Sequence, residues 1–98
     1  MTHAHRGIVI AIASGWMLWH DVGIYNAGGP RLGGQTYAAL AYDTEAACNA
    51  GRGVAIANEA VHRRSPLTET VAAGIVVWDA SRRHYTMFRY RCAPVSDR

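Results

Sequence analysis

The feature that most restricts the fold of this chain is a single helix-type segment, residues 44–64, with strand-type sequence on both sides. Thr44 suits the N-cap position, and Glu45 complements the positive end of the helix dipole. The Ser65-Pro66 pair stops the helix, because a residue before proline disfavours helical backbone. Two glycines inside the segment leave open a break into two shorter helices. Apolar residues recur at the helical intervals of three and four: Ala47, Ala50, Val54, Ala57 and Val61.

Strand-type sequence precedes and follows this segment. We expect strands at 15–22, 73–79 and 85–92, because these stretches are rich in β-branched and aromatic residues or alternate in polarity. A short further strand is expected at 36–42. Residues 23–36 are rich in glycine and contain a proline, which predicts a loop or an irregular connection. The sum is an α+β fold in which one helix packs on a small antiparallel sheet, in the order β-(β)-α-β-β.

Alternation within two of these strands predicts which side chains share a face. In the last strand one face carries Thr86, Phe88, Tyr90 and Cys92, and the other carries Met87, Arg89 and Arg91. In the first strand one face carries Trp16, Leu18 and His20, and the other carries Met17, Trp19 and Asp21.

The chain has two cysteines, Cys48 near the start of the helix and Cys92 at the end of the last strand. A two-layer fold can bring these positions within bonding distance. A disulfide between them would stabilise the folded state by about 4 kcal/mol, because it lowers the entropy of the unfolded chain. Two other interpretations stay open at this point. Both cysteines could be reduced and buried, or Cys48 could be a nucleophile activated by the helix N-terminus. No Cys-x-x-Cys or local protease signature accompanies them.

The first residues have the order of a secretory signal: a cationic start ending at Arg6, an apolar run from 7 to 13, and the small-residue pattern Ala11-Ile12-Ala13. Since such signals usually span about 15–30 residues, we interpret 1–13 as a truncated signal peptide and 14–98 as one small α+β domain. The alternative is that residues 8–19 form one long buried strand. The apolar run is too short for a stable membrane span.

The formal charge is +3, and all ten basic side chains outside histidine are arginine. From residue 61 onward the charge is +4, which could attract anionic partners. The candidate contacts to nucleic acid or another anion are Arg82, Arg83, Arg89 and Arg91. His3 and His5 form an H-x-H that could touch a transition metal, but two histidines at a terminus, within the expected signal, make a poor site. The other histidines, His20, His62 and His84, have no metal-ligand spacing, and the stretch from Gly28 to Thr36 lacks the lysine of a phosphate-binding loop. We therefore expect no metal, cofactor or catalytic residue.

Three stretches give the chain a resemblance to short exported bacterial proteins of unknown function. They are Trp16-Met17-Leu18-Trp19, Tyr42-Asp43-Thr44 followed by Cys48, and Tyr90-Arg91-Cys92-Ala93-Pro94. The chain departs from that pattern in its truncated signal and its Ala/Gly-rich helix. What the resemblance implies is a Cys48–Cys92 disulfide and export to the periplasm or the exterior. It implies no activity.

The sequence thus predicts an exported, disulfide-linked domain without catalysis, a structural or interaction module whose partner is a protein or an acidic surface. The alternative is a cytoplasmic nucleic-acid-binding module that uses the arginine-rich and aromatic strand at the C-terminal end. A cysteine-dependent enzyme is the third hypothesis.

Overall fold

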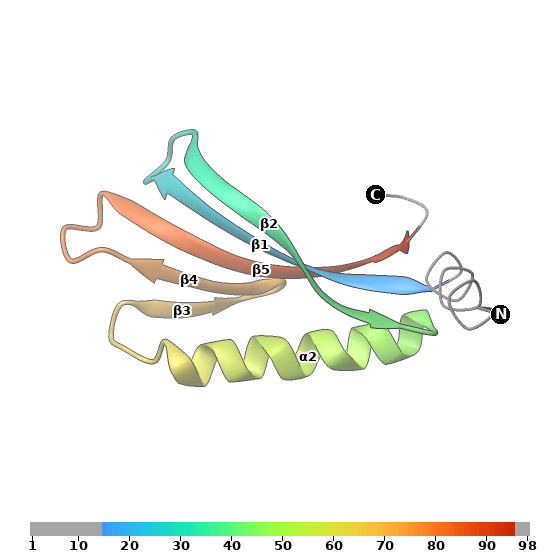
Figure 1. The fold of residues 1–98 in the computed structure, drawn as a ribbon. Helices are drawn as coiled ribbons and strands as arrows, with labels where there is room; N and C mark the ends of the chain where they lie inside the picture. Colours follow the sequence, from blue (N-terminus) through green and yellow to red (C-terminus); the bar gives the residue numbers. More distant parts are fainter. Residues whose placement is uncertain (1–14, 96–98) are drawn as a thin grey trace, which may run out of the picture.

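The computed structural model describes residues 15–95 and contains one helix against a five-stranded antiparallel sheet (Figure 1). The predicted fold class is therefore confirmed. The elements are β1 (Trp16–Asn26), β2 (Arg31–Tyr42), α2 (Glu45–His62), β3 (Thr68–Val71), β4 (Gly74–Trp78) and β5 (His84–Pro94). The truncated signal peptide predicted at 1–13 lies outside the described residues.

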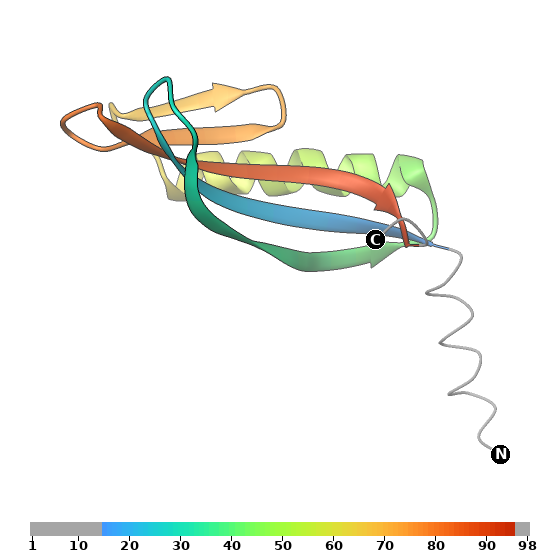
Figure 2. The ribbon, with the colours of Figure 1, turned by 90° about the horizontal axis from the view of Figure 1, so that it is seen from above.

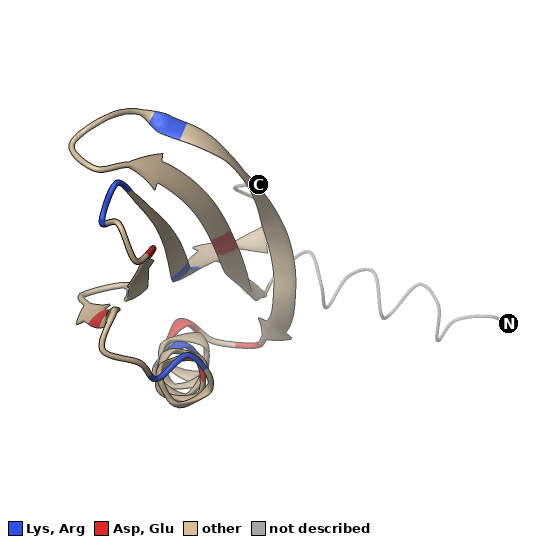
Figure 3. Cartoon of the chain, turned by 90° about the vertical axis from the view of Figure 1, so that its left-hand side faces the viewer, with Lys and Arg blue, Asp and Glu red and all other residues tan. Residues whose placement is uncertain are grey.

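The strands lie in the order β2-β1-β5-β4-β3, so β1 and β5 form the long central pair. Their register places Leu18 opposite Cys92 and His20 opposite Tyr90. Helix α2 runs along the length of the sheet (Figures 1 and 2), mainly over β5 and β1. Seen along the helix, the sheet curves around it (Figure 3). The faces predicted from alternation in 15–22 and 85–92 are those that the paired strands adopt.

The stretch 23–36 corrects one prediction, because most of it is regular strand. β1 continues to Asn26 and β2 starts at Arg31, which leaves only residues 27–30 for the turn. One glycine of this stretch allows close approach between strands. Gly34 has φ of 155°, and a Cβ on it would overlap the carbonyl oxygen of Val22 on the neighbouring strand. At this position, therefore, glycine serves strand pairing rather than a loop.

Helix α2 is a single uninterrupted element of 18 residues. Its predicted N-cap is confirmed, since the Thr44 hydroxyl accepts a hydrogen bond of 3.1 Å from the backbone N–H of Ala47. Gly51 does not break the helix. A Cβ at this position would overlap the hydroxyl of Tyr42, so glycine lets the end of β2 approach the helix closely.

The disulfide joins the first turn of α2 to the end of β5. Cys48 and Cys92 are bonded, with 6.1 Å between their Cα atoms, and Cys48 is fully buried. The bond lies in the main core cluster with Leu18 and Tyr90, against which Ile56 and other partly buried side chains pack. Both cysteines among the described residues are therefore oxidised, and neither a reduced pair nor a thiol nucleophile agrees with this structure.

Strand β3 was not expected from the sequence. It spans four residues at the edge of the sheet and pairs only with β4. Its polar residues, Glu69 and Thr70, are exposed, so the stretch lacks the apolar alternation that identifies a half-buried strand.

Candidate functional site

A groove of about 640 Å³ lies between α2 and β2. It forms because α2 lies mainly over β5 and β1, so that β2 stays exposed from Arg31 to Ala41. Leu40 of β2 and Val54 and Val61 of α2 line its two walls, and each side chain is more than half exposed, at 57%, 61% and 60%. A largely apolar groove with a few convergent polar groups has the character of a binding site.

Polar groups meet at the floor of the groove around Glu59. Its carboxylate accepts hydrogen bonds of 2.7 Å from the Tyr90 hydroxyl and 2.7 Å from Nε of Arg63. Arg63 also lies over the ring of Phe88, 4.1 Å from its centroid. Burial raises the pKa of Glu59, but the hydrogen bonds from Tyr90 and Arg63 and the nearby positive charge outweigh it and keep the pKa below its usual range. Glu59 is therefore ionised at neutral pH, and both of its carboxylate oxygens accept hydrogen bonds.

His20 completes this floor. Its ring stacks on Tyr90, with 4.3 Å between centroids and 6° between planes. Its Nε2 lies 3.9 Å from Oε1 of Glu59 and has no hydrogen-bond partner among the described residues. Burial, followed by the hydrogen bond to Glu59, raises the pKa of Tyr90. The cluster fixes α2 on the sheet and gives the groove a polar floor.

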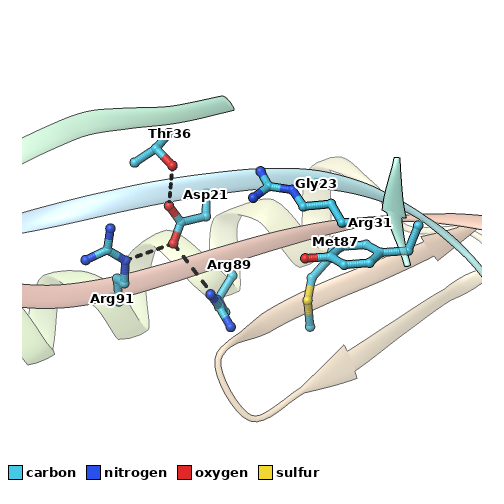
Figure 4. A pocket seen from close by; sticks show the side chains of 8 residues that line it. Asp21, Gly23, Arg31, Thr36, Met87, Arg89 and Arg91 are labelled. Carbon is cyan, nitrogen blue, oxygen red and sulfur yellow. Dashed lines mark hydrogen bonds and ion pairs between the residues drawn. The ribbon is translucent and has the colours of Figure 1, made fainter. Parts of the chain in front are cut away.

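The opposite face of the sheet carries a smaller, polar hollow of about 240 Å³ centred on Asp21 (Figure 4). Asp21 accepts hydrogen bonds of 2.7 Å from Thr36 and 3.0 Å from Arg91, and Nε of Arg89 lies 3.9 Å away. Burial raises the pKa of Asp21, but these bonds and the two arginine charges outweigh it and lower the pKa. Asp21 thus neutralises part of the arginine charge on this face.

The four predicted anion-binding arginines do not form one cluster. Arg89 and Arg91 lie together on the open face beside Asp21. Arg82 lies at the turn before β5, 3.7 Å from Glu69 and over the ring of Trp78. Arg83 occupies the same turn, so six to nine residues of chain, roughly 20–30 Å of strand, separate the two groups.

Sequence reasoning did not single out Glu59, at the floor of the groove, or Asp21, at the centre of the polar hollow. Each looked like an isolated acid without a partner. One feature of the sequence could have pointed to these two acids, namely that each stands alone in a long stretch without other acids. Asp21 is the only acid before residue 43, and Glu59 is the only acid between residues 46 and 61. An acid in such a stretch has few alternatives to a structural or binding role once it is half-buried.

Comparison of the chain with protein-family models, with curated proteins and with solved structures finds no match. Among residues 15–95, no helix is both long and apolar enough to cross a bilayer. Within the same residues, no three histidine, cysteine, aspartate or glutamate side chains lie close enough together to hold a metal ion.

Proposed function

We propose that the protein is an exported, non-catalytic interaction module that binds a protein partner through the α2–β2 surface. This name denotes six apolar residues on the outer side of α2 and on the facing part of β2: Leu40, Ala47, Ala50, Val54, Ala57 and Val61. The observation that carries the proposal is that this whole surface is exposed although it bears no charge. A helix facing water normally carries charged and polar residues on its outer side, and contiguous exposed apolar surface marks interaction sites.

The charges of α2 support this interpretation. Between residues 46 and 61 the helix has two charged residues, Arg52 and Glu59, and both are half-buried rather than on the outer side. The outer side carries alanine, valine, glycine and asparagine. Solubility alone would favour charges there, so their absence points to a surface that is covered in the working state of the protein.

Support for export comes from the disulfide and the signal-like N-terminal sequence together. Disulfides persist outside the cytosol and are rare within it, and the Cys48–Cys92 bond is buried in the core. Absence of catalysis is supported by the chemistry of the cysteines and of Glu59. Both thiols are in the bond, and Glu59 is ionised and already accepts hydrogen bonds from Tyr90 and Arg63.

A fusion to a reporter enzyme that is active only outside the cytosol tests export. The full chain is expected to carry the reporter out and to give activity. The variant Ile8→Arg/Ile10→Arg, which interrupts the apolar run, is expected to lose that activity, while Leu32→Arg in the exposed part of β2 serves as the control. Reporter activity that is absent, or unaffected by Ile8→Arg/Ile10→Arg, would contradict the proposal.

A second candidate function rests on the half-exposed Arg89 and Arg91 side chains of the open face. Their charges could hold an anionic polymer such as nucleic acid. Retention on immobilised single-stranded nucleic acid at low salt, lost in Arg89→Ala/Arg91→Ala but kept in Arg64→Ala, would favour this function. Absence of retention at low salt would remove it.

A further inference from the structure

The outward residues of α2 have the spacing of a helix–helix seam. The exposed positions 47, 50, 54, 57 and 61 recur at intervals of three, four, three and four, and the structure leaves all five uncovered. This is the alternation by which two helices pack along each other. The residues that hold α2 to the sheet lie on the other side of the helix, so the seam is a second, independent apolar face.

The residues beside the seam favour close approach of another helix. Ala46, Gly53 and Ala60 flank it on one side, and none of them carries a charge. A Cβ added at Gly53 would meet nothing within 4 Å, which leaves open space along this flank. The two valines, Val54 and Val61, project from this small-residue surface and are about 60% exposed.

We propose that the occupant of the seam is helix α2 of a second copy of this chain, packed antiparallel. The inference rests on the proposed function, since it identifies the partner of the same surface. The described chain contains one helix with this seam, and a two-fold pair makes every contact twice. A register that places Val54 opposite Ala57 of the second copy also places Val61 opposite Ala50, so each large side chain faces a small one.

Charge complementarity selects the antiparallel direction. The N-terminal end of α2 is acidic, with Asp43 and Glu45, and the C-terminal end is basic, with His62 and Arg64. An antiparallel pair places the acidic end of each helix beside the basic end of the other, whereas a parallel pair would place like charges together. The helix dipoles favour the same direction.

The groove gives the second helix a further wall. Leu40 projects from β2 on one side of the groove, and Val54 and Val61 line the other side. A helix lying along the seam on the side of β2 would cover Leu40 as well as the valines. Burial of these side chains provides the driving force for association, because it removes apolar area from water.

Sedimentation equilibrium of the oxidised full chain tests the proposal. Wild-type protein is expected to form a dimer as its concentration is raised to about 1 mM. Val54→Glu places a charge in the seam and is expected to weaken the dimer at least 100-fold, about 2.8 kcal/mol at 1.4 kcal/mol per factor of ten. The matched control is Asn49→Glu, an exposed position on the same helix outside the seam, which is expected to leave the dimer unchanged.

Two further measurements keep the outcome unambiguous. Circular dichroism and thiol labelling of Val54→Glu check that the monomer is folded and oxidised, as the exposure of Val54 leads us to expect. Val54→Leu keeps an apolar side chain in the seam and is expected to preserve the dimer. A wild-type monomer at every concentration, or a dimer that Val54→Glu leaves intact, would overturn the proposal. Failure of export would contradict the proposed function while leaving the dimer in place.

Discussion

Replacing Tyr90 with phenylalanine removes a single hydroxyl from beneath α2 and leaves Glu59 with one fewer hydrogen-bond donor. Tyr90 is 7% exposed and the Glu59 side chain 11%, so water replaces the lost donor poorly. A hydrogen bond to a charged group is worth about 1.5–3 kcal/mol. We therefore expect Tyr90→Phe to destabilise the fold by about 2 kcal/mol. At about 4–8 °C per kcal/mol for a domain of this size, Tm falls by roughly 8–16 °C.

Urea denaturation of the oxidised protein measures this loss, and Tyr25→Phe is the matched control. Tyr25 is half-buried on the opposite face, and its hydroxyl makes no hydrogen bond to the described residues. A double-mutant cycle with Glu59→Gln isolates the pair, and the two substitutions are expected to be clearly non-additive. A cost below about 0.5 kcal/mol for Tyr90→Phe, or strict additivity, would refute the reasoning, because values of that size are typical of ordinary surface substitutions.

The same cluster sets a pH dependence. The folded pKa of Glu59 is lowered, so its contribution is present above the unfolded value of about 4.3 and is lost as pH falls through the lower folded pKa. The folded pKa of Tyr90 is raised, so its contribution is lost as pH rises above the unfolded value of about 10. Glu59→Gln is expected to flatten the acid side of the stability profile, and Tyr90→Phe the alkaline side. Unchanged profiles would contradict the assignment of these shifts.

Three further substitutions test the described fold by denaturation. Cys48→Ala/Cys92→Ala is expected to lower stability by about 4 kcal/mol, because the bond closes a loop with a sequence separation of 44; an unchanged midpoint would contradict this. Gly53→Ala is expected to stabilise α2 by roughly 1 kcal/mol, since its Cβ meets open space. Gly74→Ala is expected to destabilise by about 1–3 kcal/mol, since its Cβ overlaps the backbone oxygen of Phe88 on β5. Equal effects of the two glycine substitutions would show that these local environments are wrongly described.

Much of the fold could be predicted because one face of the sheet is covered and the other is not. That asymmetry produces the alternation in β5, where Phe88 and Tyr90 face the helix and Arg89 and Arg91 do not. The β1–β2 hairpin could not be predicted, because glycine is the usual residue of loops. At Gly34, glycine is required because the neighbouring strand lies too close for a side chain. The sequence around Gly34 does not show which strand will lie beside it.

The candidate site was less accessible to sequence reasoning. Helical spacing predicted that residues 44–64 form a helix, but α2 has two apolar sides, and spacing does not tell which of them meets the sheet. The disulfide decides it: Cys48 must face β5, so Val54 and Val61 turn outward. The partnership of Glu59 with Tyr90 spans 31 residues of sequence, and no local pattern connects the two.

The most direct test of the account is the state of the two cysteines in the protein as its own cells make it. Cells are quenched with acid, the protein is alkylated without reductant, and its mass is measured. The account predicts that no alkyl group is added and that proteolysis yields a joined peptide containing Cys48 and Cys92. Two alkyl groups on the freshly isolated chain would contradict a module that is oxidised and works outside the cytosol.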